Sequence, residues 1–216
     1  MQPCGSAVTA RVEHLVTSGT FSLDGQTFDV DNNVWLLGDD DEVLVIDAPH
    51  DPDDIAAAVD GRRVVAIACT HAHDDHVRSA PELAERLSAP VLLHPDDRVL
   101  WDLTHPGLEP DGPLHDGMVL EVAGCDVEVL HTPGHAPGAV CFWVRDLGAV
   151  FSGDTLFAGG PGATGRSYSE FPVILQSIRD RLLTLPPDTV VHPGHGADTT
   201  VGAEAPSYDE WVMRGS

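Results

Sequence analysis

The chain has 216 residues, and its 35 acidic side chains outnumber 11 basic ones, so the formal net charge is −24. This charge disfavours nucleic acid and anionic membrane surfaces as partners, because both are negatively charged. No run approaches the roughly 18 consecutive apolar residues of a membrane span, and no basic start precedes an apolar stretch as in a signal peptide. We expect a cytoplasmic protein whose residues 1–216 form a single domain.

The first half of the chain alternates strand-like and helix-like segments. Short β-branched runs bounded by Gly, Asp and Asn predict strands at residues 8–16, 28–38 and 42–48. A helix is predicted over 52–61, which opens on proline with acids in its first turn, and the nearly continuous apolar run 62–70 predicts a strand covered on both faces. The pattern then repeats as an amphipathic helix at 79–88, a strand at 90–94 and a short helix at 95–103.

The second half begins with a loop, because residues 104–117 are rich in Pro, Gly and His. Two hairpins follow, one from runs 118–124 and 126–132, the other from runs 138–144 and 148–154. A helix over 171–185 and a strand over 188–196 complete the pattern. The order of these elements favours an α/β fold of two packed sheets with helices outside, a four-layer αββα sandwich, although composition alone does not distinguish it from a three-layer α/β fold.

The segment His-Ala-His-Asp-Asp-His at 71–76 is too polar to continue the strand before it. His71 and His73 are two residues apart, so an extended backbone would place both side chains on the same side. Asp75 and His76 follow at once, on a turn that leads into a helix. Neutral imidazole and carboxylate groups suit zinc, iron or manganese, so the segment predicts a metal site at the end of a strand.

Three later segments place a polar residue beside glycine where a predicted strand ends. They contain His135, Asp154 and His195. Glycine lets the backbone turn sharply and leaves room for the neighbouring side chain. Because strand ends meet on one edge of a sandwich, we expect these three residues to converge on the segment 71–76.

The segment 71–76 has the HxHxDH pattern of the metallo-β-lactamase-fold superfamily, and the chain resembles that superfamily over about residues 28–200. The segments SGDTLFAGG and HPGHG are most similar to its glyoxalase II branch, the hydroxyacylglutathione hydrolase-like enzymes. That branch carries a C-terminal helical domain with further glutathione contacts, and we expect this chain to lack it. The resemblance implies a dinuclear centre, and its proposed ligands, position by position, are His71, His73 and His135 for one metal, Asp75, His76 and His195 for the other, and Asp154 as the bridge.

Two divalent ions, zinc above all with iron or manganese as alternatives, are the implied cofactors. Such ions lower the pKa of a shared water from 15.7 toward about 7, which makes a bridging hydroxide the nucleophile of a hydrolase. Asp75 and Asp154 are the candidate catalytic residues. Asp47, which ends a predicted strand, and Thr132 are candidates to orient the metal ligands from behind.

The expected partner is a small molecule, and the resemblance to glyoxalase II favours a thioester of a low-molecular-weight thiol. Arg166 and Tyr168 are the counterparts of that branch's basic residue and tyrosine, which contact the substrate. The lysine-free composition, rich in Ala, Asp, Arg and Gly, resembles that of high-GC bacteria or haloarchaea. Many high-GC actinobacteria use mycothiol in place of glutathione, so mycothiol is a candidate carrier.

Other functions remain open at this point. A persulfide dioxygenase with one iron shares the scaffold, and a lactonase or β-lactamase needs the same hydroxide. A metal-binding interaction module without catalysis is the alternative from another class, and it predicts that Asp154→Ala leaves the biological role intact. A nuclease of the same superfamily is disfavoured by the net charge of −24. Metal stoichiometry and substrate assays discriminate among these functions.

Overall fold

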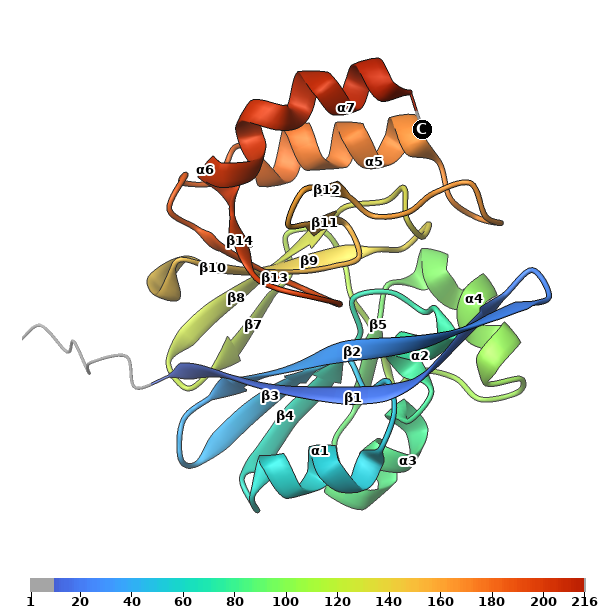
Figure 1. The fold of residues 1–216 in the computed structure, drawn as a ribbon. Helices are drawn as coiled ribbons and strands as arrows, with labels where there is room; N and C mark the ends of the chain where they lie inside the picture. The colour runs from blue at the N-terminus through green and yellow to red at the C-terminus, as the bar shows by residue number, and fades with distance from the viewer. Residues whose placement is uncertain (1–9, 216) are drawn as a thin grey trace, which may run out of the picture.

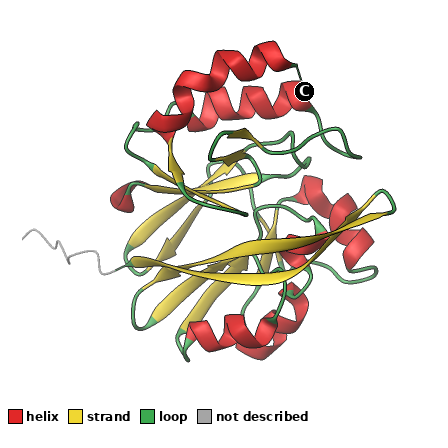
Figure 2. Ribbon diagram, in the orientation of Figure 1, coloured by secondary structure: helices red, strands yellow, loops and turns green. Residues whose placement is uncertain are grey.

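The structure of the protein is a computed structural model that describes residues 10–215. Two six-stranded sheets pack face to face, and helices cover the outer face of each (Figures 1 and 2). The four-layer αββα sandwich expected from the order of elements is therefore confirmed.

The first sheet has the strand order β1-β2-β3-β4-β5-β6. Its strands are β1 (Arg11–Leu23), β2 (Gln26–Gly38), β3 (Glu42–Ile46), β4 (Arg63–Ala68), β5 (Val91–Leu93) and β6 (Gly112–Pro113). Strands β3, β4, β5 and β6 run parallel to one another, whereas β1, β2 and β3 pair antiparallel. Parallel neighbours end at the same edge of the sheet, and the polar segment 71–76 begins just beyond that edge.

The second sheet has the order β14-β13-β10-β9-β8-β7. Its strands are β7 (Val119–Val122), β8 (Cys125–His131), β9 (Val140–Val144), β10 (Ala149–Gly153), β13 (Val190–Pro193) and β14 (Thr199–Thr200). A separate ribbon pairs β11 (Leu156–Phe157) with β12 (Gly160–Pro161). Strands β8, β10 and β13 point the same way, because β9 is antiparallel to both β8 and β10 while β10 and β13 are parallel.

Helices pack on both sheets. The α-helices are α1 (Pro52–Val59), α2 (Asp74–Val77), α3 (Ala80–Leu87), α4 (Arg98–Thr104), α5 (Phe171–Ser177), α6 (Val201–Glu204) and α7 (Tyr208–Arg214). Shorter turns are the 3₁₀ segments η1 (Pro95–Asp97), η2 (Arg145–Leu147) and η4 (Ala205–Ser207), and the π-helical η3 (Ile178–Leu182). Figure 1 shows α1 and α3 against the first sheet, and α5 and α7 against the second.

Side-chain alternation along the central strands explains the layers. In β9, the buried Phe142 faces the core between the two sheets, while its neighbours Cys141 and Trp143 face the core under α5 and α7. In β4, Ala66 likewise faces the inter-sheet core and Ile67 faces the core under α1 and α3. These strands are covered on both faces, as the run 62–70 predicts, because successive side chains of a strand point to opposite sides.

The structure departs from the predicted elements in several places. The first strand, predicted over 8–16, runs on to Leu23, and with β2 it forms a long hairpin whose tip projects past the sheet toward α4 (Figure 1). The predicted loop 104–117 contains the short strand β6, and the predicted helix 171–185 ends at Leu182. The predicted first strand is too short because most side chains of β1 are at least partly exposed, which weakens the apolar pattern in the sequence.

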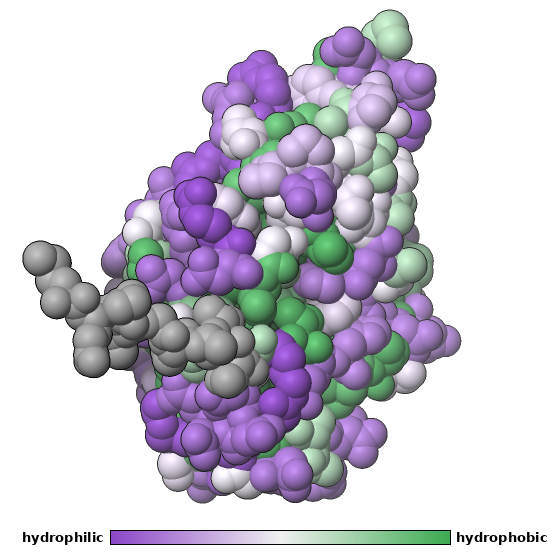
Figure 3. Space-filling view, turned by 90° about the vertical axis from the view of Figure 1, so that its left-hand side faces the viewer, coloured by the Kyte–Doolittle hydropathy of each residue, from purple (hydrophilic) through white to green (hydrophobic). Residues whose placement is uncertain are grey.

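The surface is largely hydrophilic, in keeping with the excess of acidic residues. In the view of Figure 3, hydrophilic residues dominate and hydrophobic ones gather in a narrow band across the middle. Among residues 10–215, none of the helices has the length and apolar character needed to cross a membrane.

Candidate metal centre

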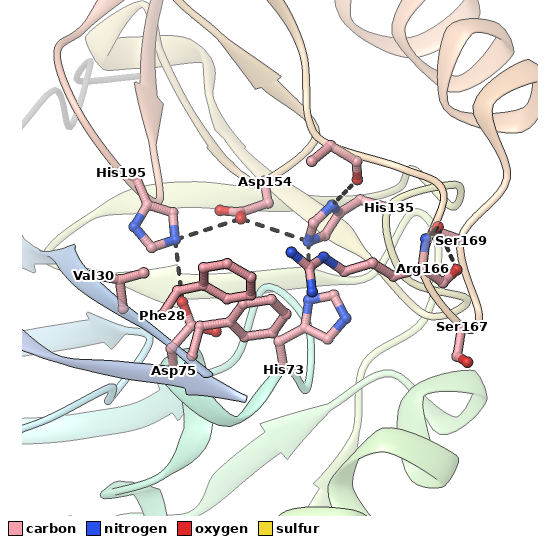
Figure 4. Close-up of a pocket in the computed structure, with 12 residues that line it drawn as sticks. Phe28, Val30, His73, Asp75, His135, Asp154, Arg166, Ser167, Ser169 and His195 are labelled. Carbon is pink, nitrogen blue, oxygen red and sulfur yellow. Dashed lines mark hydrogen bonds and ion pairs between the residues drawn. The ribbon is translucent and has the colours of Figure 1, made fainter. Parts of the chain in front are cut away.

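The seven predicted ligands lie together at the edge where β4, β8, β10 and β13 end. His71 and His73 follow β4, His135 follows β8, Asp154 follows β10, and His195 follows β13. Figure 4 shows five of the seven, with His195, Asp75 and Asp154 grouped beside His135 and His73. The side chains converge because the strands that precede them point in the same direction within each sheet. Since the two sheets are stacked, the ends of these strands lie at one edge.

The first group comprises His71, His73 and His135, whose ligand atoms lie within 4.8 Å of one another. The Nδ1 atom of His73 is 3.1 Å from Nε2 of His71 and 3.0 Å from Nε2 of His135. Tetrahedral zinc with bonds of about 2.0–2.1 Å would separate its ligand atoms by about 3.4 Å. The three nitrogens therefore surround a position of the size that one such ion requires.

The second group comprises Asp75, His76 and His195. The Nε2 atoms of His76 and His195 are 3.3 Å apart, and Asp75 Oδ2 is 3.8 Å and 3.3 Å from them, respectively. All three residues are largely withdrawn from solvent, and Asp75 and His76 are buried. The distances between ligand atoms are similar to those in the first group, but one of the three ligands here is a carboxylate.

Asp154 lies between the two groups, and its carboxylate is close to histidines of both. Its Oδ2 is 3.5 Å from Nε2 of His135 and 3.5 Å from Nε2 of His195, while its Oδ1 is 3.4 Å from Nε2 of His76. A carboxylate in this position can bind two cations at once. The arrangement suits a dinuclear metal site.

Hydrogen bonds on the outer side of two imidazoles turn their other nitrogen toward the centre. Nδ1 of His135 donates to the carbonyl oxygen of Ala163 at 2.8 Å, and Nδ1 of His195 donates to that of Asp31 at 2.7 Å. A ring whose Nδ1 is held in this way offers Nε2 to a metal, which replaces any proton there on binding. Backbone carbonyl partners leave no signal in a sequence, so the sequence analysis missed both.

Asp47 occupies the predicted supporting position. Its Oδ2 is 2.8 Å from Nδ1 of His76 and also accepts the hydroxyl of Thr70 at 2.8 Å, while its Oδ1 accepts the Thr70 backbone N–H at 2.7 Å. The Thr70 hydroxyl oxygen in turn lies 3.1 Å from Nδ1 of His71. One buried carboxylate thus orients a ligand of each group, and Thr70 is a link that the sequence analysis did not identify.

Thr132 does not take the predicted supporting role. Its hydroxyl lies 3.0 Å from that of Thr155 and 3.2 Å from the sulfur of Cys141, and it reaches none of the seven side chains. Asn32, in β2, supports the centre instead. Its side-chain amide donates to Asp75 Oδ2, and the two atoms are 3.1 Å apart.

The charges at the centre are unevenly shared between the two groups. Burial, together with neighbouring histidines, lowers the pKa of His71 well below its usual value and that of His73 to about 3. Burial also acts to lower the pKa of His195, but the charge of Asp154 and hydrogen bonds to Asp154 and Asp75 outweigh it and raise the pKa to about 10. The nearby carboxylates thus favour the protonated form of His195 in the second group, whereas the imidazoles of His71 and His73 in the first group are neutral.

The donor set fits two divalent transition-metal ions. The Oδ1 of Asp154, which lies between the two groups, is buried and has no hydrogen-bond partner among residues 10–215. Burying a polar atom without a partner is costly, and imidazole and carboxylate groups are ligands that zinc, iron and manganese accept.

Gly194 leaves space for the second group. A side chain at this position would collide with the Asp154 carboxylate and would place its Cβ 2.6 Å from Cε1 of His76. Glycine is therefore required at position 194, the first of the two glycines in HPGHG, because the backbone there approaches two predicted ligands closely.

Asp97 connects the two loops that carry the first group. This buried carboxylate accepts the N–H of Ala72, between His71 and His73, and the N–H of Gly138, which follows the His135 loop. Burial raises the pKa of Asp97 to about 6, although both hydrogen bonds act to lower it. Asp97 lies in η1, and no sequence motif indicates its role.

A cavity of about 220 Å³ opens over the centre. His73, Asp75, His135, Asp154 and His195 contribute to one part of its lining. The rest is formed by Phe21, Phe28 and Val30 of the hairpin and by Ala163, Arg166, Ser167 and Ser169 (Figure 4). The long hairpin thus forms an apolar wall opposite the predicted ligands.

Arg166 lies at this cavity as predicted, but Tyr168 does not line it. The guanidinium carbon of Arg166 is 4.7 Å from the ring centre of Phe28 and 5.3 Å from that of Phe21, distances at which a cation is attracted to an aromatic face. Among residues 10–215, no carboxylate lies within 4.0 Å of this guanidinium. Tyr168 is 46% exposed and adopts a left-handed backbone conformation, between Ser167 and Ser169, which do line the cavity.

Residues 27–195 match the sequence profile of the Metallo-beta-lactamase superfamily. The probable metallo-hydrolase YqgX of Bacillus subtilis (strain 168) is 35% identical over 188 residues, which cover 80% of this chain and 88% of YqgX. The hydroxyacylglutathione hydrolase GloC of Haemophilus influenzae is 32% identical over 148 residues, covering 62% of this chain and 70% of GloC.

Solved structures with the same fold include a B3 metallo-beta-lactamase, BLEG-1, at 27% identity and a TM-score of 0.76. The alignment covers 91% of this chain and all of that one. The protein TTHA1623, solved in a di-iron-bound form, is 38% identical with a TM-score of 0.73, covering 82% of this chain and 93% of that one.

Proposed function

This chain belongs to the metallo-beta-lactamase superfamily and is similar to the probable metallo-hydrolase YqgX, and we propose that it hydrolyses a thioester of a low-molecular-weight thiol at a dinuclear metal centre. The observation that carries the proposal is the convergence of seven side chains at a cavity whose other wall holds Arg166. In this proposal His71, His73 and His135 hold one metal, Asp75, His76 and His195 hold the other, and Asp154 bridges them.

When bound, two dications would supply a water of lowered pKa and would polarise the substrate carbonyl. The protein's own residues fix the geometry in which this happens. Asp47 holds His76 in one tautomer, and the amide of Asn32 turns Asp75 Oδ2 toward the second group. Both Asp75 and Asp154 line the cavity, so their carboxylates are placed to accept a proton from the attacking water.

The cavity supports an acyl-thiol as substrate. Its apolar wall of Phe21, Phe28 and Val30 suits the carbon and sulfur atoms of the acyl and thiol portions. Arg166, whose guanidinium lies close to two aromatic rings and has no carboxylate within 4.0 Å among the described residues, suits a carboxylate on the thiol carrier, such as those of glutathione. The similarity to GloC, whose name describes hydrolysis of a hydroxyacyl thioester, supports the same class.

The proposal is tested with purified protein loaded separately with zinc, iron or manganese. S-lactoylglutathione and an S-acyl mycothiol are the substrates, and released thiol is measured with a colorimetric disulfide reagent. We expect thiol release that falls by about 100-fold or more in Asp154→Ala, because a ligand shared by both metals is lost. The control Asp146→Ala removes an exposed carboxylate from η2, remote from the cavity, and should retain full turnover.

Two outcomes would redirect the assignment. Hydrolysis of a chromogenic β-lactam without thiol release would favour the chemistry named for BLEG-1, and hydrolysis of lactones alone would favour a lactonase. One iron per chain with oxygen uptake on a persulfide would favour a dioxygenase, and the di-iron form of TTHA1623 makes iron a necessary arm of the test. Unchanged turnover in Asp154→Ala would contradict the dinuclear mechanism itself.

A further inference from the structure

A second cluster of metal-binding side chains lies outside the seven-residue centre. His94 follows β5, Asp96 lies in η1, and His131 is the last residue of β8. One ligand atom from each of these residues lies within 4.8 Å of those of the other two. No hydrogen bond or ion pair among residues 10–215 joins the three to a residue of the seven-residue centre.

The separations within this cluster are close to those of a bound ion. Nδ1 of His94 is 3.8 Å from Oδ2 of Asp96, against the roughly 3.4 Å expected between two ligands of tetrahedral zinc. The rings of His94 and His131 lie nearly parallel, with centres 4.1 Å apart. Binding therefore requires a tilt of one ring and a rotation of the Asp96 side chain, which is 62% exposed and free to move.

The hydrogen bond of His131 prepares its imidazole to act as a ligand. Nε2 of His131 donates to the carbonyl oxygen of Pro137 at 3.0 Å, which leaves Nδ1 as the nitrogen that can bind a metal. An imidazole that gives one N–H to a backbone carbonyl and presents its other nitrogen is the usual form of a metal ligand. Nδ1 of His94 accepts the backbone N–H of Asp96 at 3.3 Å, and a metal ion at this nitrogen would replace that long hydrogen bond.

The surroundings favour an uncharged His94 ring and leave room for a further ligand. Burial, followed by the nearby His131, lowers the pKa of His94 and so favours its neutral form. Three side chains leave one position of a tetrahedral ion for water. His115 is the nearest further imidazole, with its ring centre 6.4 Å from that of His94.

Structural roles account for only part of the arrangement. His94 caps η1, and its ring stacks on that of His131, so both histidines have a place in the fold. The exposed Asp96 carboxylate, which faces His94 without a hydrogen bond to it, has no such role. Two imidazoles and one carboxylate are a set that zinc accepts and that also suits nickel or copper.

We propose that His94, Asp96 and His131 form an additional binding site for one divalent transition-metal ion. The ion would connect the end of β5 to the end of β8, in different sheets. The proposal is independent of the substrate and of the dinuclear mechanism, because it depends on residues that take no part in either.

The test measures zinc bound per chain after the full-length protein, stripped with chelator, is dialysed against buffered zinc. We expect the wild type to bind one equivalent more than Asp96→Asn and one more than His131→Gln. The control is His105→Gln. Nε2 of His105 also contacts a backbone carbonyl, that of Val77 at 2.9 Å, but within residues 10–215 His105 belongs to no group of three potential metal ligands. This variant should bind as much zinc as the wild type.

A second readout follows the imidazole ring signals by nuclear magnetic resonance during the zinc titration. Signals of His94 and His131 should shift with the additional equivalent, while those of His105 stay in place. Equal zinc binding by wild type and Asp96→Asn, or unchanged His94 and His131 signals at saturation, would overturn the proposal. Asp96 is exposed, so the Asp96→Asn chain is expected to fold and the result remains interpretable. Failure of the seven-residue centre to bind two ions would not alter the difference between wild type and variant.

Discussion

Gly194→Ala tests the geometry of the centre without removing any ligand. The new Cβ would lie 2.6 Å from Cε1 of His76 and closer still to the Asp154 carboxylate. Normal carbon–carbon contact is about 3.5–4.0 Å, so the imidazole must retreat by about 1 Å. Gly194 does not have the positive φ that would strain alanine, so the collision accounts for the whole effect.

A displacement of about 1 Å at a catalytic group costs about 100-fold in rate, and overpacking costs about 1–3 kcal/mol of stability. We expect Gly194→Ala to lose turnover by that factor and to release metal from the second group more readily, measured by acyl-thiol assay and by metal content after dialysis. The control Gly117→Ala lies at a positive φ with open space around it, and should lose about 1 kcal/mol of stability with activity retained. Wild-type turnover and metal content in Gly194→Ala would refute the placement of His76 and Asp154.

Three further predictions concern the groups around the centre. Asp47→Asn should weaken metal binding by about 10–100-fold in a chelator competition, because His76 loses its charged partner; unchanged affinity would contradict the role of Asp47. Arg166→Gln should raise KM for a carboxylate-bearing acyl-thiol by about tenfold or more with kcat nearly constant, and an equal effect on an uncharged acyl-thiol would argue against a carboxylate contact. Because the pKa of Asp97 is raised to about 6, its proton stabilises the fold at pH below about 4, and that contribution is lost as the pH rises through 6. Asp97→Asn should abolish this part of the pH dependence in urea unfolding, and identical profiles for both proteins would exclude it.

The central strands and the convergence of the seven proposed ligand residues were predictable because each leaves a strong local pattern. The apolar run 62–70 is typical of a covered strand, and the proposed ligand residues follow strand ends in the order that the resemblance to the superfamily implies. Asp47 was found for the same reason, since an acid that ends a buried strand next to a histidine cluster has few other partners.

The remaining parts depend on contacts between segments far apart in the chain. Asn32 supports Asp75 across 43 positions, and its neighbours in β2 give no sign of that contact. The hairpin wall of the cavity was missed because the partly exposed side chains around Phe21 and Phe28 weaken the strand pattern. The hydroxyl of Thr132 lies 3.0 Å from that of Thr155, a contact between distant segments that the sequence does not indicate.

The central claim is that a dinuclear centre cleaves an acyl-thiol, and the most direct measurement is metal content and turnover on the same sample. The Asp96→Asn background is the right starting protein, because it removes the additional cluster from the count. The account predicts two metal equivalents per chain and thiol release that declines together with metal content when Asp154→Ala is added. Full thiol release with a single metal per chain, or two bound metals with no thiol released from any acyl-thiol, would contradict it.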